Sequence, residues 1–289
     1  MRSKTIATSS SDKIKPELPA PTREFLYLSR AFRRGIFFMC DLVLVHGFCE
    51  SASMWNALLE QFGPNSRILN LDLPGFGSRN SEPVLPIEQA AVWVLDQADS
   101  AGLNRFTFVG HSMGGYVGAS LLQQAPNRLA GLCLMNSHGR ADTAEKIQNR
   151  IKTIGFLEKH GASPFLDIFV RDLVAPSRDK DEALIAELRE MVDSTPVESI
   201  IGALSAMMDR KDQVELLATS PVPVQLILGQ ADKMYSPLEV MASHTDIPLL
   251  QVNLLDSGHL SPIECPADAA AALEKFLGFS SWYGSYSSV

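Results

Sequence analysis

The stretch RFTFVGHSMGGYVGASLL, residues 105–122, decides the fold. An apolar run, RFTFV, leads into GHSMG at residues 110–114, and apolar residues at helical spacing follow. A G-x-S-x-G motif between a strand and a helix is typical of a sharp turn that exposes a nucleophilic serine. Glycines let the backbone make this turn without a Cβ clash, and the new helix puts unpaired N–H groups beside the serine. The stretch therefore predicts Ser112 as a nucleophile on a strand–helix turn.

The same alternation of strand and helix surrounds this turn. DLVLVHGF, SRILNLDLPGFG and LAGLCLMNSHG are short apolar strand patterns, and SMWNALLEQF and IEQAAVWVLDQADSAG have helical spacing. Strand patterns return at VPVQLILGQADK and LLQVNLLDSGH, before a last helix in PADAAAALEKFLGF. Continuous apolar strands separated by helices are typical of a parallel sheet covered on both faces. The predicted fold class is α/β, with a doubly wound, mostly parallel sheet.

Only helical patterns occur between the two groups of strands. Four of them follow one another from ADTAEKIQNRIKTIGFLEKH to VESIIGALSAMMDRKDQVELLA. Such a segment cannot extend a sheet, so residues 140–218 are expected to be an inserted all-helical cap on a core of residues 23–139 and 219–289. Insertions at strand ends are where binding sites form, so the cap is expected to cover the site.

The first forty residues differ from the rest in their basic character. Residues 1–22 are rich in Ser and Pro and have no apolar period, so they are expected to be a disordered arm or an expression remnant. Residues 23–40 are expected to give one or two irregular edge strands. The alternative is an amphipathic surface helix, but an Arg cluster without a lipid anchor would bind a membrane only marginally.

Composition excludes several classes of function. The 289-residue chain has 25 Lys and Arg against 33 Asp and Glu, a net charge of −8, which repels nucleic acid. The four cysteines show no C-x-x-C spacing, so neither a metal site nor a disulfide framework is predicted. No apolar run approaches the ~18 residues of a membrane span, and none follows the basic start as in a signal peptide. A cytoplasmic protein is expected, and its oligomeric state stays open.

A serine nucleophile needs a base and an orienting acid, and two late strands end in suitable residues. Asp232 follows QLILGQA and His259 follows NLLDSG, each just past the carboxyl end of a predicted parallel strand, as Ser112 is. Sites form at that edge of open α/β sheets. His259 would move the serine proton, and Asp232 would hold its ring. Asp256 and Glu264 flank His259 too closely in sequence to reach the far side of its ring.

The other histidines are assigned supporting positions. His46, before Gly47, and His111, before Ser112, are expected to support the site residues from behind or to be structural. His138 lies at the hinge into the cap and could face the pocket, while His160 and His244 fall in polar helical surroundings and are expected to be solvated.

An oxyanion hole requires two backbone donors, each worth roughly 3 kcal/mol. Met113 N–H is one candidate and Phe48 N–H, after the bend at Gly47, is the other. Walls of the cleft over Ser112 are expected from seven residues: Cys49, His138, Phe165, Met207, Met208, Met234 and Tyr235. Flexible and aromatic walls without an evident arginine clamp favour an apolar group. The expected partner is a small to medium-chain carboxylic ester, and the chemistry requires no metal or cofactor.

Together, the motifs LVLVHGF, DLPGFGSRN, VGHSMGG, LGQADKMYSP and SGHLSPIECP resemble the α/β-hydrolase superfamily, in particular its capped serine carboxylesterase-like branch, over roughly residues 41–279. The resemblance implies a triad of Ser112, Asp232 and His259 in the chain order of that class. It also implies ester hydrolysis through an acyl-enzyme.

Related activities are weighed on the same motifs. Epoxide hydrolases and haloalkane dehalogenases are similar but use Asp where this chain has Ser112, which disfavours those activities. C–C bond hydrolases, enol-lactonases and cofactor-free haloperoxidases of this fold share the motifs, so a C–C bond hydrolase or enol-lactonase stays an alternative. A non-catalytic ligand-binding member is disfavoured by the intact Ser, Asp and His.

Overall fold

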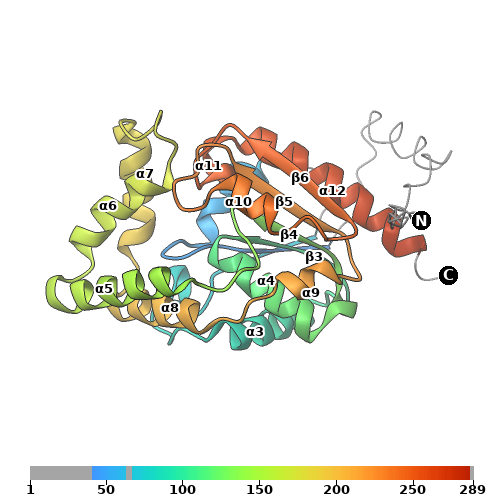
Figure 1. Ribbon diagram of the computed structural model, residues 1–289, viewed down its shortest axis with the longest axis horizontal. Helices are drawn as coiled ribbons and strands as arrows, with labels where there is room; N and C mark the ends of the chain where they lie inside the picture. Colours follow the sequence, from blue (N-terminus) through green and yellow to red (C-terminus); the bar gives the residue numbers. More distant parts are fainter. Residues whose placement is uncertain (1–40, 63–66, 287–289) are drawn as a thin grey trace, which may run out of the picture. The chain divides into compact units, whose positions relative to one another are not determined.

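The computed structural model describes residues 41–62 and 67–286. Within these ranges, six parallel strands form one sheet. The strand order is β2-β1-β3-β4-β5-β6 (Figure 1). The strands are β1 (Asp41–Val45), β2 (Arg67–Leu71), β3 (Phe106–His111), β4 (Leu129–Met135), β5 (Val224–Gly229) and β6 (Leu250–Leu255). The order of the strands changes direction between β1 and β3, and ligands bind beyond the carboxyl ends of strands at such a switch point.

The central strands are buried along their whole length because both faces of the sheet are covered. Every residue of β3 and of β5 is buried, as expected for the largely apolar sequences FTFVGH and VQLILG. Edge strand β6 has a less buried, alternating pattern in LQVNLL. These apolar runs pair in parallel throughout, so the α/β prediction for the sheet is confirmed.

Helices pack on both faces of the sheet. α3 (Ile87–Ser100) packs against α4 (Met113–Gln124), which lies on β3 and β4, whereas α12 (Pro266–Tyr286) packs against β4, β5 and β6 on the other face (Figure 1). Shorter elements complete the core: η1 (Ala52–Trp55), α2 (Asn56–Leu59), η2 (Gly77–Arg79), η3 (Pro126–Arg128), α10 (Pro237–Ala242) and α11 (Ser261–Glu264).

The segment between β4 and β5 contains helices and no strand. These helices, called the cap helices below, are α5 (Ala144–His160), α6 (Ser163–Leu173), α7 (Glu182–Asp193), α8 (Val197–Asp209) and α9 (Val214–Ala218). α5 packs on α8 and α6 packs on α7 (Figure 1). The last helical pattern of the cap is divided after Asp209, because Arg210 adopts an extended backbone and its guanidinium binds the carbonyl oxygen of Met207 at 2.6 Å.

Two predictions fall outside the described residues: the disordered arm of residues 1–22 and the edge strands of residues 23–40. Among the helices of the described ranges, none combines the length and the apolar character that crossing a bilayer demands.

Candidate active site

Ser112 stands on a strained turn between β3 and α4. Its φ of 48° lies in the left-handed region, which is unfavourable for a residue with a side chain. The turn is held because Ser112 N–H donates to the carbonyl oxygen of Met135 at 3.0 Å, and Ser137 Oγ donates to the carbonyl oxygen of Ser112 at 2.7 Å. A Cβ on Gly110 would lie 2.2 Å from the carbonyl oxygen of Gly114, so this turn requires glycine.

Backbone strain is concentrated at this edge of the sheet. In the described ranges, the residues other than glycine with positive φ are Cys49 (61°), Ser112 (48°) and Asn136 (46°). They follow β1, β3 and β4, three adjacent strands of the sheet. Each unfavourable backbone conformation costs roughly 1–3 kcal/mol, and such residues cluster where function requires them.

Asp232 and His259 form a buried hydrogen bond at the same edge. His259 Nδ1 lies 2.8 Å from Asp232 Oδ2, while the other carboxylate oxygen accepts N–H bonds from Met234 at 2.7 Å and Tyr235 at 3.2 Å. Burial alone would raise the pKa of Asp232, but His259, Asn136 and the backbone donors lower it below its ordinary value. An ionised Asp232 fixes the proton on His259 Nδ1 and leaves Nε2 as an acceptor.

The loop that carries His259 is held between the core and the cap helices. His259 N–H donates at 2.7 Å to the carbonyl oxygen of Leu173, at the end of α6. The carboxylate of Glu264 accepts N–H bonds from Gly258 and Ala175, each at 2.9 Å. The position of His259 therefore depends on the cap helix α6 as well as on β6.

A buried pair, Glu50 and His111, was missed as functional by sequence reasoning. Glu50 Oε2 accepts the N–H of Gly47 at 2.6 Å and lies 2.8 Å from His111 Nδ1. Both side chains are at most 1% exposed. The sequence sign was a glutamate directly after the apolar pair Phe48-Cys49 in the loop that follows β1. The prediction that His111 is structural agrees with this position behind Ser112.

The two proposed oxyanion donors are both unused. In the described part of the chain, neither Phe48 N–H nor Met113 N–H donates to a protein acceptor. Met113 is the first residue of α4, where helix N–H groups have no partner within the helix. The loop of Phe48 passes close to the serine, since a Cβ on Gly47 would lie 3.0 Å from Ser112 Cβ.

Tyr235 lies beside all three candidate residues, Ser112, Asp232 and His259. No hydrogen bond among the described residues joins Ser112 Oγ to His259 Nε2. The Tyr235 phenol lies 2.6 Å from the hydroxyl oxygen of Tyr116. It is also near enough to the Ser112 hydroxyl for that group to act to lower the pKa of Tyr235. Its ring centroid is 5.2 Å from that of His259. Burial, reinforced by Tyr116, raises the pKa of Tyr235 well above its ordinary value, so the phenol stays protonated.

The predicted wall residues occupy different environments. Phe165 packs edge-on against Phe48, with ring centroids 6.3 Å apart. The rings of Tyr235 and His138 also pack edge-on, with centroids 4.6 Å apart. Cys49 and Met207 are buried in the hydrophobic core, Met208 is partly buried, and Met234 is 39% exposed.

The prediction that His244 is solvated is wrong. The side chain is 2% exposed, its Nε2 accepts the N–H of Gly139 at 2.9 Å, and its Nδ1 bonds the carbonyl oxygen of Val240 at 2.8 Å. The short helix α10 ends beneath the loop after β4, so a locally polar sequence becomes buried. His160, by contrast, is exposed as expected.

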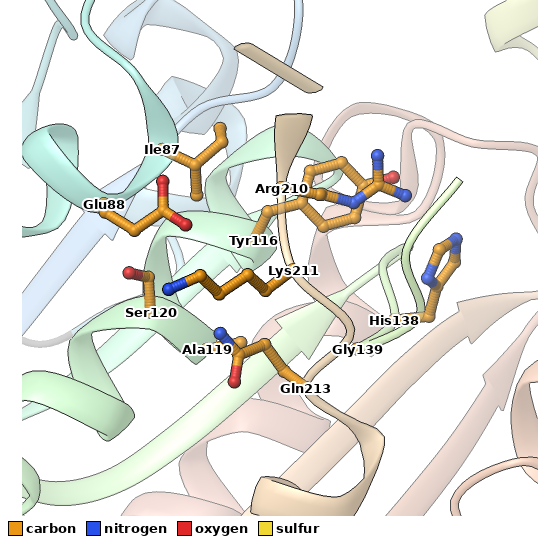
Figure 2. A pocket seen from close by; sticks show the side chains of 10 residues that line it. All are labelled: Ile87, Glu88, Tyr116, Ala119, Ser120, His138, Gly139, Arg210, Lys211 and Gln213. Atoms are coloured by element: carbon orange, nitrogen blue, oxygen red, sulfur yellow. The ribbon is translucent and has the colours of Figure 1, made fainter. Parts of the chain in front are cut away.

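The sequence showed no evident arginine clamp, but the structure places two cations against the tyrosines of the site. The Arg210 guanidinium lies 3.9 Å from the ring centroid of Tyr116, and Lys146 Nζ lies 4.5 Å from that of Tyr235. Figure 2 shows Arg210 against Tyr116, with His138 beside them, on the wall of a pocket between α3, α4 and the α8–α9 connection.

Among the described residues, no three His, Cys, Asp or Glu side chains are grouped so that they could hold a metal ion. The arrangement at the edge of the sheet is suited to nucleophilic and acid–base chemistry by side chains and backbone N–H groups.

Comparison with known proteins gives similar enzymes. The pimeloyl-[acyl-carrier protein] methyl ester esterase of Yersinia enterocolitica is 33% identical over 98 residues, which are 34% of this chain and 36% of that protein. The 2-succinyl-6-hydroxy-2,4-cyclohexadiene-1-carboxylate synthase of Enterobacter sp. is 24% identical over 82% of this chain and 91% of its own length. A malate-bound thermophilic esterase from Thermogutta terrifontis has a TM-score of 0.77 and 29% identity, covering 84% and 91% of the two chains.

The match to the Yersinia esterase thus spans only about a third of that protein's length. The model of the alpha/beta hydrolase family, in contrast, matches residues 42–273, from β1 into α12. With its parallel sheet and its strand–helix turn at Ser112, this chain belongs to the alpha/beta hydrolase family.

Proposed function

We propose that this protein is a serine hydrolase that cleaves small to medium-chain carboxylic esters through an acyl-enzyme. The observation that carries the proposal is the Asp232–His259 hydrogen bond, which leaves His259 Nε2 free at the sheet edge where Ser112 stands on its left-handed turn. Acyl transfer needs these three groups in one place.

In the proposed first step, Ser112 Oγ attacks the ester carbonyl carbon while His259 Nε2 takes the hydroxyl proton. The alcohol then leaves with that proton, and the acyl group stays on Ser112. Catalytic hydrogen bonds often form only in the substrate complex. We therefore expect the Ser112 hydroxyl to exchange its contact with Tyr235 for His259 Nε2 when an ester binds.

The second step releases the acid. A water molecule gives a proton to His259 and attacks the acyl-enzyme, and Ser112 Oγ recovers the proton as the carboxylic acid leaves. The unused N–H groups of Phe48 and Met113 would stabilise the oxyanion in both steps. Asp232, with its lowered pKa, stays ionised and stabilises the imidazolium.

The similar proteins support ester hydrolysis more than the alternatives. Two of the three are named as esterases, including the Thermogutta protein, which aligns with 84% of this chain. A C–C bond hydrolase or enol-lactonase would use the same triad, so substrates must separate these activities.

The decisive test is the hydrolysis of p-nitrophenyl acetate and butyrate by the wild type and by Ser112→Ala. The expected loss is about 10⁴-fold or more in kcat. Ser81→Ala, which changes an exposed serine, is the control and should keep full activity. A fluorophosphonate should label the wild type and not Ser112→Ala. Equal hydrolysis by both proteins would refute the proposal, and selective turnover of enol-lactones or vinylogous diketones would favour the alternatives.

A further inference from the structure

Cations from the cap segment gather around the two tyrosines beside Ser112. Arg150 and Arg210 share one carboxylate with a fully buried side chain, Asp142, which lies 2.5 Å from Arg150 Nε and 2.8 Å from an Arg210 guanidinium nitrogen. Lys146, in the same region, has no such partner among the described residues. Glu239 is engaged with Arg140 at 4.0 Å. The region therefore carries excess positive charge, although the whole chain is acidic.

Lys146 is the cation without a counter-ion. It lies in the first turn of α5, where its own N–H donates to the capping hydroxyl of Thr143 at 3.2 Å. No carboxylate of the described residues lies within 4 Å of its Nζ, which instead faces the Tyr235 ring. Burial lowers the pKa of Lys146. Taking a cation from water without a partner is costly, so this position is suited to an anion that arrives with a ligand.

His138 supplies an unused N–H donor beside Lys146. The side chain is 3% exposed, and its ring lies 4.6 Å from that of Tyr235 and 5.6 Å from that of Tyr116. Its Nδ1 accepts the N–H of Arg140 at 3.1 Å, so the ring proton is on Nε2, for which no described residue provides an acceptor. Burial and the surrounding cations lower the pKa of His138 well below its ordinary value, which keeps the ring neutral.

Arg210 supplies another unused N–H donor, in addition to that of His138. Its Nε is buried and has no hydrogen-bond partner among the described residues, although its terminal nitrogens bind Met207, Arg140 and Asp142. Buried N–H groups are normally paired, so the unpaired Arg210 Nε points to a missing acceptor, and the His138 N–H and the Lys146 ammonium group lie in the same region.

We propose that Lys146, His138 and Arg210 form a wall that binds a carboxylate of the substrate, so that the preferred esters are half-esters of dicarboxylic acids. This inference rests on the proposed ester hydrolysis. Tyr235 contacts both Lys146 and Ser112, so the carboxylate would bind about one aromatic ring away from the reacting carbonyl group. A site built to bind a charged group discriminates strongly against neutral analogues, because its polar groups are then left unpaired.

The experiment compares monoethyl esters of malonic, succinic, glutaric and adipic acid with ethyl alkanoates of equal chain length. We expect the wild type to have a higher kcat/KM for at least one half-ester than for its neutral counterpart. In Lys146→Met, the loss on that half-ester should exceed the loss on the neutral ester by roughly tenfold to 100-fold, the range for a lost hydrogen bond to a charged group. Lys152→Met, which changes an exposed lysine on the same helix, should leave the preference intact.

A binding measurement separates this inference from the proposed function. Glutarate should raise the melting temperature of the wild type and of Lys152→Met but not that of Lys146→Met. Equal kcat/KM values for charged and neutral esters, or equal losses on both in Lys146→Met, would overturn the inference while leaving ester hydrolysis standing. If no ester is hydrolysed, the proposed function fails, and a glutarate shift that depends on Lys146 would still support the anion-binding wall.

Discussion

His111 Nε2 donates to the carbonyl oxygen of His259 at 2.7 Å, and its other ring nitrogen lies 2.8 Å from the carboxylate of Glu50. Because both partners are acceptors, both nitrogens carry protons and His111 is an imidazolium. Burial acts to lower the pKa of His111, but Glu50 raises it above its ordinary value. His111 in turn lowers the pKa of Glu50 against the effect of burial. Since Glu50 also holds Gly47 N–H, one ion pair connects the Phe48 loop with the His259 loop.

Glu50→Gln should destabilise the fold strongly, because it leaves His111 as a buried charge without a counter-ion. The expected loss is about 3–5 kcal/mol in the free energy of unfolding, measured by chemical denaturation. The stabilisation from Glu50 is lost as pH falls through its lowered folded-state pKa, and that from His111 is lost as pH rises through its raised one. The difference between wild type and variant should therefore be largest at intermediate pH.

His111→Gln and the double variant complete a thermodynamic cycle for this pair. We expect the double variant to be more stable than the sum of the single losses implies, by roughly 0.5–3 kcal/mol, because it contains no unpaired charge. Strict additivity would show that the two side chains do not act as an ion pair.

Asp232→Asn should abolish most activity while the protein stays folded. The amide can still accept N–H bonds from Met234 and Tyr235, but it no longer fixes the His259 proton on Nδ1. The expected fall in kcat on p-nitrophenyl butyrate is about 10⁴-fold. Asp256→Asn replaces an exposed carboxylate three residues before His259 and should be fully active. If Asp256→Asn were the inactive variant, the assignment of the acid would be wrong.

The sheet, and the strand ends that carry the candidate residues, could be predicted from the sequence. Short, largely apolar runs such as FTFVGH that alternate with helical patterns are typical of central parallel strands, and the carboxyl ends of parallel strands share one edge. For this reason Ser112, Asp232 and His259 could be placed at a common edge from their positions after strand patterns alone.

Contacts between separate loops and helices could not be predicted in the same way. Glu50 and His111 are 61 residues apart, and His244 meets Gly139 from 105 residues away, so no local pattern announces either hydrogen bond. Lys146 and Arg210 belong to polar stretches of sequence at the ends of α5 and α8. Only the packing of these two helices against each other brings both cations beside the tyrosines.

Buried His244 should make the protein less stable in acid. Burial lowers its folded-state pKa, and Nε2 must be unprotonated to accept the N–H of Gly139. Below about pH 6.5 the unfolded state binds a proton that the folded state excludes, so stability falls as pH falls. Thermal denaturation at pH 7 and pH 5 should show a smaller difference in His244→Gln than in the wild type. His160→Gln, at an exposed position on α5, should keep the wild-type difference, and a similar reduction there would contradict the assignment to His244.

Gly114 allows the start of α4 to approach the end of β1, and Gly114→Ala should damage both stability and catalysis. The added Cβ would lie 2.4 Å from the carbonyl oxygen of Val45 and 2.7 Å from that of His46, and backbone atoms cannot move aside cheaply. We expect a loss of roughly 1–3 kcal/mol on chemical denaturation. We also expect a fall in kcat, because the Phe48 loop would move away from Met113 N–H.

Gly155→Ala is the matched control. Nothing lies within 4 Å of a Cβ added at Gly155, in the middle of α5, so this variant should stabilise the protein by up to about 1 kcal/mol. Full activity in Gly114→Ala would mean that the close approach of β1 to α4 does not form the oxyanion site.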